Sequence, residues 1–174
     1  MVREPTRSEI LGAFDRLSGE ARIMAMRRAV TALRNKNNRM RFRTPGELAM
    51  SVDRKMRQTP ALELIDKEIA KALRDGGRLI ITMPPQEGKS TRVAIWTPIW
   101  ALMRNPDSRI VVASYAASLA RRNAMASREI IAQYGSGAID PLSGAAMPDR
   151  LGLALNPNHR QATSWSVLGA QGGV

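Results

Sequence analysis

The sequence contains no cysteine and only one histidine, His159, and both scarcities exclude particular kinds of site. Without cysteine there is neither a disulfide framework nor a thiolate metal centre. His159 has no acidic cluster near it in the sequence, so we do not expect it to bind a metal ion. Apolar runs stay well short of the ~18 residues that a membrane-spanning helix needs. Residues 1–20 carry charges throughout instead of the apolar core of a signal peptide. These features predict a cytosolic protein without a membrane partner.

Acidic residues are also in short supply, at 15 against 27 lysines and arginines, which gives a net charge of +12. An excess of this size points toward a polyanionic partner. Its distribution is uneven, because residues 1–58 carry a net charge of +8, and residues 22–45 contain eight basic side chains and no acid. Such a stretch fits either contacts to the phosphates of double-stranded DNA or a solvated helix face followed by a connector. Its one aromatic residue, Phe42, gives little support for base stacking.

The apolar pattern divides the chain into a basic helical extension, 1–43, and a second unit, 44–174. In the second unit, Thr44-Pro45 and Thr59-Pro60 each predict the start of a helix, because threonine can cap a helix and proline suits its first position. Further along we expect a strand at 78–82, a helix from Lys89 to about Arg104 kinked at Pro98, a strand at 109–113, a helix from about Ala116 to Gln133, and a strand between Gln161 and Leu168. Alternating strands and helices of these lengths predict an α/β fold with a parallel βαβ unit.

The segment between the first of these strands and its helix carries the clearest chemical signal, Met83-Pro84-Pro85-Gln86-Glu87-Gly88-Lys89-Ser90-Thr91. Gly-Lys-Ser in this context predicts phosphate binding, because backbone N–H groups and the helix dipole at a helix start attract an anion. Gly88 would allow close backbone approach, Lys89 would reach the β- and γ-phosphates of a nucleotide, and the Ser90 hydroxyl would ligate Mg²⁺. The usual pattern has glycine in place of Met83. The alternative is therefore an ordinary turn between strand and helix with an exposed lysine.

Longer stretches around this loop resemble the large subunit of tailed-bacteriophage terminases, a family whose deviant Walker A loop has Pro-Pro where glycine is usual. The resemblance spans roughly residues 44–174 and includes the Thr59-Pro60 helix and the Trp- and Gly-rich residues 163–174. It is strongest over three runs: Leu79-Ile80-Ile81-Thr82-Met83-Pro84-Pro85-Gln86-Glu87-Gly88-Lys89-Ser90, Trp100-Ala101-Leu102, and Asn105-Pro106-Asp107-Ser108-Arg109-Ile110-Val111-Val112-Ala113-Ser114-Tyr115.

This resemblance implies an incomplete P-loop (RecA-like) parallel sheet with flanking helices, in a motor that packages viral DNA into the capsid. The cofactors would be ATP and Mg²⁺, and the partners double-stranded DNA, the terminase small subunit and the capsid portal. The full-length protein would form a homo-oligomeric ring in the host cytoplasm. Lys89 would be catalytic. Gln58 would read adenine, as upstream glutamines do in related motor ATPases; the alternative for Gln58 is an exposed residue at a helix start. The residues implied to contact the nucleotide are Pro84, Pro85, Gln86, Glu87, Gly88, Lys89, Ser90, Thr91 and Gln58.

The sequence also departs from that family pattern. Many relatives carry arginine at the position of Gln86, and here the acidic Glu87 follows. No apolar strand ends in paired acids, so the Walker B strand is missing, and the nuclease carboxylates are missing as well. We therefore expect an N-terminal part of a terminase large subunit that binds nucleotide weakly and hydrolyses it poorly by itself. Two alternatives remain open: a non-catalytic DNA-binding or packaging-adaptor module with a vestigial P-loop, and a helicase-like P-loop ATPase.

Overall fold

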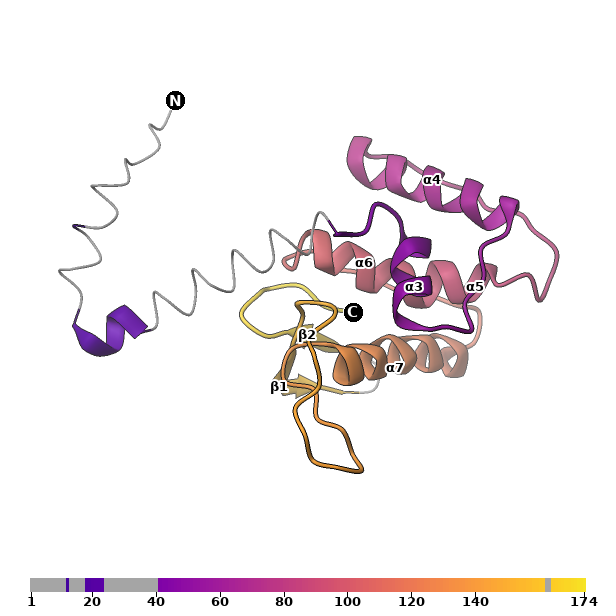
Figure 1. The fold of residues 1–174 in the computed structure, drawn as a ribbon. Helices are drawn as coiled ribbons and strands as arrows, with labels where there is room; N and C mark the ends of the chain where they lie inside the picture. The colour runs from indigo at the N-terminus through magenta and orange to yellow at the C-terminus, as the bar shows by residue number, and fades with distance from the viewer. Residues whose placement is uncertain (1–11, 13–17, 24–40, 162–163) are drawn as a thin grey trace.

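The computed structural model describes residues 12, 18–23, 41–161 and 164–174 (Figure 1). Most of the predicted extension 1–43 lies outside these residues, so its helical character stays a prediction. From Pro45 onward the elements are helices α3 (Pro45–Val52), α4 (Pro60–Asp75), α5 (Lys89–Thr91), the π-helix η1 (Arg92–Trp96), α6 (Thr97–Arg104) and α7 (Ala117–Tyr134), then strands β1 (Leu155–Arg160) and β2 (Trp165–Val167).

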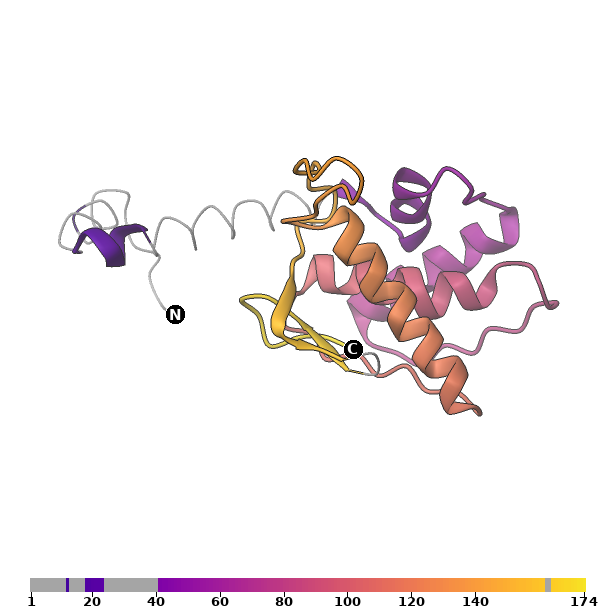
Figure 2. The same cartoon turned by 90° about the horizontal axis from the view of Figure 1, so that it is seen from below.

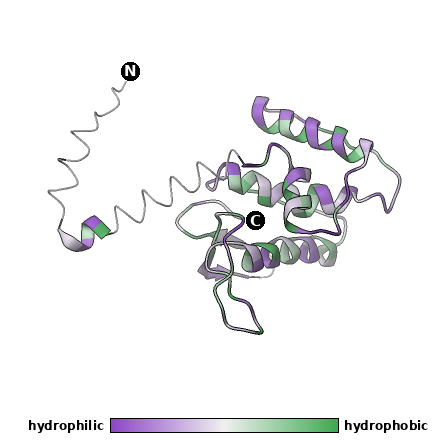
Figure 3. Cartoon of the chain, in the orientation of Figure 1, coloured by the Kyte–Doolittle hydropathy of each residue, from purple (hydrophilic) through white to green (hydrophobic). Residues whose placement is uncertain are grey.

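Helices α3 and α4 begin at the two Thr-Pro pairs, as predicted. Thr44 Oγ1 accepts a hydrogen bond from the Glu47 N–H at 3.2 Å, and Thr59 Oγ1 accepts one from the Leu62 N–H at 3.3 Å. Each threonine thus satisfies one of the N–H groups that a helix start leaves without an intrahelical partner. Figure 3 shows apolar and polar residues alternating around α4. This pattern allows one side of α4 to be buried against the rest of the molecule while the other side meets water.

The predicted helix from Lys89 to Arg104 is confirmed, and it is continuous through α5, η1 and α6. Its middle widens into a π turn, in which the Thr97 N–H donates to the Arg92 carbonyl. Pro98 explains the wide turn, because it has no N–H to give to the carbonyl four residues earlier. We expected a kink at Pro98, and the irregularity that the structure has is this π turn just before it. The Ser127 hydroxyl on α7 donates to the Ile95 carbonyl at 3.2 Å, which joins α7 to the π turn.

This central helix forms the middle layer of the fold. It contacts both α3 and α7, and Figures 1 and 2 show α4 and α7 on opposite sides of it. The core between these layers contains three buried tryptophans, Trp96, Trp100 and Trp165. Trp100 Nε1 donates to the Phe42 carbonyl at 3.0 Å, and Trp165 Nε1 donates to the Ala124 carbonyl at 3.1 Å. Both indoles therefore bury their rings without leaving a donor unpaired.

The sheet of the described residues is a two-stranded antiparallel pair, β1 with β2. Strand β2 lies inside the predicted strand 161–168 and confirms it, whereas β1 was not predicted. The chain end adds bridges on either side, because Gly173 pairs with Ser166 and with Arg109. The glycine-rich end is thus hydrogen-bonded between β2 and the segment that follows α6.

The two segments expected to form a parallel sheet, 78–82 and 109–113, are not strands in the described structure. Residues 78–82 have no β pairing there, and 109–113 contribute only the bridge from Arg109 to Gly173. Apolar side chains on both segments face solvent, with Ile80 92% and Val111 89% exposed. A strand needs a neighbour to pair with, and strands of parallel sheets are normally covered on both faces. The incomplete P-loop sheet therefore stays a prediction.

Candidate nucleotide-binding site

The loop before the central helix has an unusual backbone. Gln86 has φ of 66° and Gly88 has φ of 83°, and Gln86 is the only non-glycine residue with positive φ in the part of the chain that the structure describes. Glycine adopts this left-handed conformation freely, whereas a residue with a side chain pays on the order of 1 kcal/mol or more for it. Gly88 caps the helix, and no side chain caps it with a hydrogen bond. The first N–H groups of the helix are therefore open to an anion.

The predicted phosphate-binding side chains lie together at this helix start. Lys89 and Thr91 are partly exposed, and Ser90 is exposed. Among the described residues, the Lys89 ammonium and the Ser90 hydroxyl have no hydrogen-bond or ion-pair partner. The remaining loop residues, Pro84, Pro85, Gln86 and Glu87, are exposed as well. The structure thus presents an uncapped helix start with a free cation and a free hydroxyl, and it also places the Glu87 carboxylate in solvent beside them.

The end of the loop rests against the start of α4. A Cβ atom placed on Gly88 would lie 3.6 Å from Leu62 Cδ1, which is ordinary van der Waals contact. The Arg92 N–H donates to the Gly88 carbonyl at 2.9 Å, one helical turn further on. Gln58 and Thr59 directly precede α4. The fold therefore brings the start of α4 against the end of the loop, and Gln58 lies in the segment that leads into α4.

Gln58 is half-buried and forms a triad with two buried side chains, Asp66 and Arg92. Arg92 and Asp66 are 3% and 1% exposed, and they form an ion pair through Arg92 Nη1 and Asp66 Oδ2. Arg92 Nη1 also donates to Gln58 Oε1 at 3.0 Å, and Gln58 Nε2 donates to Asp66 Oδ2 at 2.7 Å. Asp66 Oδ1 has no partner among the described residues. Removing either charge would leave the other buried and uncompensated, so the triad must form as a unit.

Sequence reasoning did not single out Asp66 or Arg92, although a signal was present for each. Asp66 lies on the same side of α4 as the buried Leu62, Ile65 and Ile69. Arg92 begins an otherwise apolar run in the central helix. Charged residues are almost never fully buried unless they are paired. An acid and a base that each interrupt an apolar helix face could therefore have been proposed as partners.

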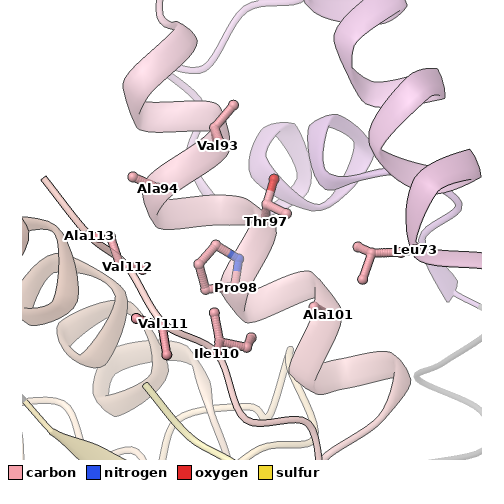
Figure 4. A pocket seen from close by; sticks show the side chains of 10 residues that line it. All are labelled: Leu73, Val93, Ala94, Thr97, Pro98, Ala101, Ile110, Val111, Val112 and Ala113. Atoms are coloured by element: carbon pink, nitrogen blue, oxygen red, sulfur yellow. The ribbon is translucent and has the colours of Figure 1, made fainter. Parts of the chain in front are cut away.

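An apolar pocket of about 300 Å³ lies beside the central helix, but none of the loop residues 84–91 lines it. Figure 4 shows the walls of the pocket. Leu73 of α4 lies on one side, side chains of the central helix lie in the middle, and the segment 110–113 lies on the far side. The lining residues are Leu73, Val93, Ala94, Thr97, Pro98, Ala101, Ile110, Val111, Val112 and Ala113. The pocket is thus bounded by one of the two segments that were expected to be strands, and it does not contain the predicted phosphate-binding residues.

The described residues contain neither a cluster of metal-binding side chains nor a membrane-spanning helix. No group of three or more histidine, aspartate or glutamate side chains in the described ranges is placed to hold a metal ion. The Nε2 atom of His159 lies 3.3 Å from the Ser164 hydroxyl. Ser90 therefore stays the one protein ligand predicted for Mg²⁺.

The helices of the described ranges are too short or too polar to span a bilayer.

Comparison with known proteins adds no relative to this picture. No protein-family model matches the chain, and neither a curated protein nor a solved structure matches it. The resemblance to terminases therefore rests on the loop and its flanking runs. The roles that it implies for Lys89, Ser90 and Gln58 stay predictions.

Proposed function

We propose that the chain is the ATP-binding portion of a terminase large subunit, the motor that packages viral DNA. The observation that supports this most is the state of Lys89 and Ser90. Their polar groups have no partner among the described residues, and they stand at a helix start that no side chain caps. A charged and a hydroxyl group left free at an uncapped helix start suit a phosphate ligand.

The residues of the loop fit a triphosphate with its Mg²⁺ ion. The open N–H groups of α5 would bind phosphate oxygens, and the Lys89 ammonium would neutralise their charge. Ser90 would hold Mg²⁺ through its hydroxyl, and the ion would offset the charge that neighbouring phosphates share. The exposed Glu87 carboxylate next to this site opposes an anion. We therefore propose weak binding with little hydrolysis by this chain on its own.

The remaining parts of the proposal come from the resemblance. They are double-stranded DNA, the terminase small subunit and the capsid portal as partners, a homo-oligomeric ring, and the host cytoplasm as location. The basic stretch 22–45 is the part of the chain that we propose to meet DNA phosphates. The exposed apolar segments 78–82 and 109–113 support the proposed P-loop sheet, because a parallel sheet is covered on both faces and would bury Ile80 and Val111.

The test is a titration of Mg-ATP into the wild-type protein, Lys89→Ala and Lys71→Ala. Lys71 is an exposed lysine on α4, so its substitution makes the same change in net charge away from the loop. We expect Lys89→Ala to weaken binding by at least about tenfold, or ~1.4 kcal/mol, and Lys71→Ala to leave it unchanged. Equal affinities for the wild type and Lys89→Ala would overturn the proposal.

For DNA, a binding constant that does not fall as the salt concentration rises would exclude phosphate contacts by the basic stretch.

A further inference from the structure

The hydrogen bonds of the triad occupy the edge of Gln58 that could otherwise pair with adenine. A glutamine amide recognises adenine through two atoms at once, its oxygen and its nitrogen. In the structure these two atoms already meet Arg92 Nη1 at 3.0 Å and Asp66 Oδ2 at 2.7 Å. Because Arg92 Nη1 and Asp66 Oδ2 also bond to each other, the contacts of Gln58 converge and close a ring of hydrogen bonds. The bidentate edge of the amide is therefore turned into the protein.

The chemistry of the partners fixes the orientation of this amide. A guanidinium can only donate and a carboxylate can only accept, so the Gln58 oxygen must face Arg92 and its nitrogen must face Asp66. Turning the amide over would set donor against donor and acceptor against acceptor. Swinging it out toward a base would remove a hydrogen bond from Asp66, whose Oδ1 already lacks a partner among the described residues. Both movements are opposed by groups that are almost fully buried.

The same triad ties the first turns of the central helix to neighbouring segments. Arg92 lies one turn after Gly88, to which it is joined by the ordinary backbone hydrogen bond of the helix, N–H to carbonyl at 2.9 Å, and its side chain belongs to the triad. Its Nη2 atom reaches the Arg57 carbonyl at 3.5 Å, in the segment that leads into α4. Gly46 of α3 lies directly against all three side chains of the triad. The triad thus connects the central helix with the starts of α3 and α4.

We propose that Gln58, Asp66 and Arg92 are positioning residues that hold Lys89 and Ser90 in place. The site then recognises a nucleoside triphosphate by its Mg²⁺-bound phosphates and not by its base, so ATP and GTP bind alike. This inference rests on the proposed function and departs from the adenine-reading role that the resemblance implies for Gln58. The ligand class is a polyphosphate carrying any purine base.

The test measures the affinities of Mg-ATP, Mg-GTP and Mg-tripolyphosphate for the wild type, Gln58→Ala, Gln58→Glu and Gln133→Ala. Gln133 is an exposed glutamine of α7 and serves as the matched control. We expect equal ATP and GTP affinities in the wild type, and a loss of about tenfold, common to all three ligands, in both Gln58 variants. Circular dichroism during heating gives the Tm of each variant, so that binding is measured where every protein is folded. If Gln58→Ala does not fold, Gln58→Asn, which is one methylene shorter, replaces it.

The possible results separate the two levels of the proposal. A Gln58 variant that loses affinity for ATP but not for GTP or tripolyphosphate would show that Gln58 reads adenine, and would overturn the inference while leaving the proposed function intact. A lower Tm with all three affinities unchanged would show that the triad only stabilises the fold, and would also overturn the inference. A wild type that binds none of the three ligands would overturn the proposed function and this inference together.

Discussion

Replacing Gly46 with alanine tests how closely α3 approaches the triad of Gln58, Asp66 and Arg92. Gly46 is buried in the first turn of α3. A Cβ atom at this position would overlap Arg92 Nη1 and Asp66 Oδ2 and would come within 2.9 Å of Gln58 Oε1. All three neighbours are polar atoms held by hydrogen bonds inside the protein. The methyl group can therefore be accommodated only if the triad or the helix moves.

The expected loss of stability follows from three terms of known size. In an ordinary helix position, alanine in place of glycine gains about 0.5–1 kcal/mol. Forcing a methyl group into filled space costs about 1–3 kcal/mol. Disturbing a hydrogen bond to a buried charged group costs about 1–3 kcal/mol more. We therefore expect Gly46→Ala to lower the free energy of unfolding by about 3 kcal/mol, which reverses the usual sign of this substitution in a helix.

The assay is equilibrium unfolding in urea, followed by the fluorescence of the three buried tryptophans. Gly77→Ala is the control, because the nearest atoms to an added Cβ there belong to Ala72 and lie 4.0 Å away. That control should change the free energy of unfolding by less than about 1 kcal/mol. A Gly46→Ala protein as stable as the wild type, with the same dependence on urea, would refute the close packing of α3 on the triad.

Three further predictions concern single side chains. Arg92→Met should lower the free energy of unfolding in urea by about 3–5 kcal/mol, because it leaves Asp66 charged and buried. Adding Asp66→Leu should restore much of that loss, and a double variant as unstable as the single one would contradict this. Gln86→Gly should raise the free energy of unfolding by about 1 kcal/mol by removing the left-handed strain, and a decrease would show that no strain is stored there. The Ser143 hydroxyl holds the pKa of Asp140 below its ordinary value of 3.8, so Ser143→Ala should raise that pKa in an NMR titration. Because the folded pKa is the lower one, the stabilisation by this carboxylate is complete above 3.8 and is lost as the pH falls through the folded value; an unchanged midpoint in the variant would count against the hydrogen bond.

Local signals in the sequence were sufficient to predict where the helices begin and end. Thr44 and Thr59 cap α3 and α4 where the Thr-Pro pairs predicted. The helices from Lys89 to Arg104 and from Ala117 to Tyr134 agree with their predicted bounds to within about a residue. A cap and an apolar period involve residues within a few positions of each other, so they can be recognised without the rest of the fold.

Strands could not be located in the same way. The apolar segments 78–82 and 109–113 have the composition of strands, but in the described structure neither has a neighbouring strand to pair with. Strand β1, by contrast, contains Pro157 between two asparagines and forms through its pairing with β2. A strand is defined by hydrogen bonds to another part of the chain, so its own residues do not determine it.

The sequence by itself determined the helix starts, the order of the helices, and a Gly-Lys-Ser loop that enters a helix. Only the tertiary structure decided what Gln58 contacts, because its partners Asp66 and Arg92 stand 8 and 34 residues away along the chain. A glutamine before a helix has the same local sequence whether its amide faces a ligand or the protein interior. The direction of the Gln58 amide is set by the buried ion pair, which exists only once α4 and the central helix have packed together.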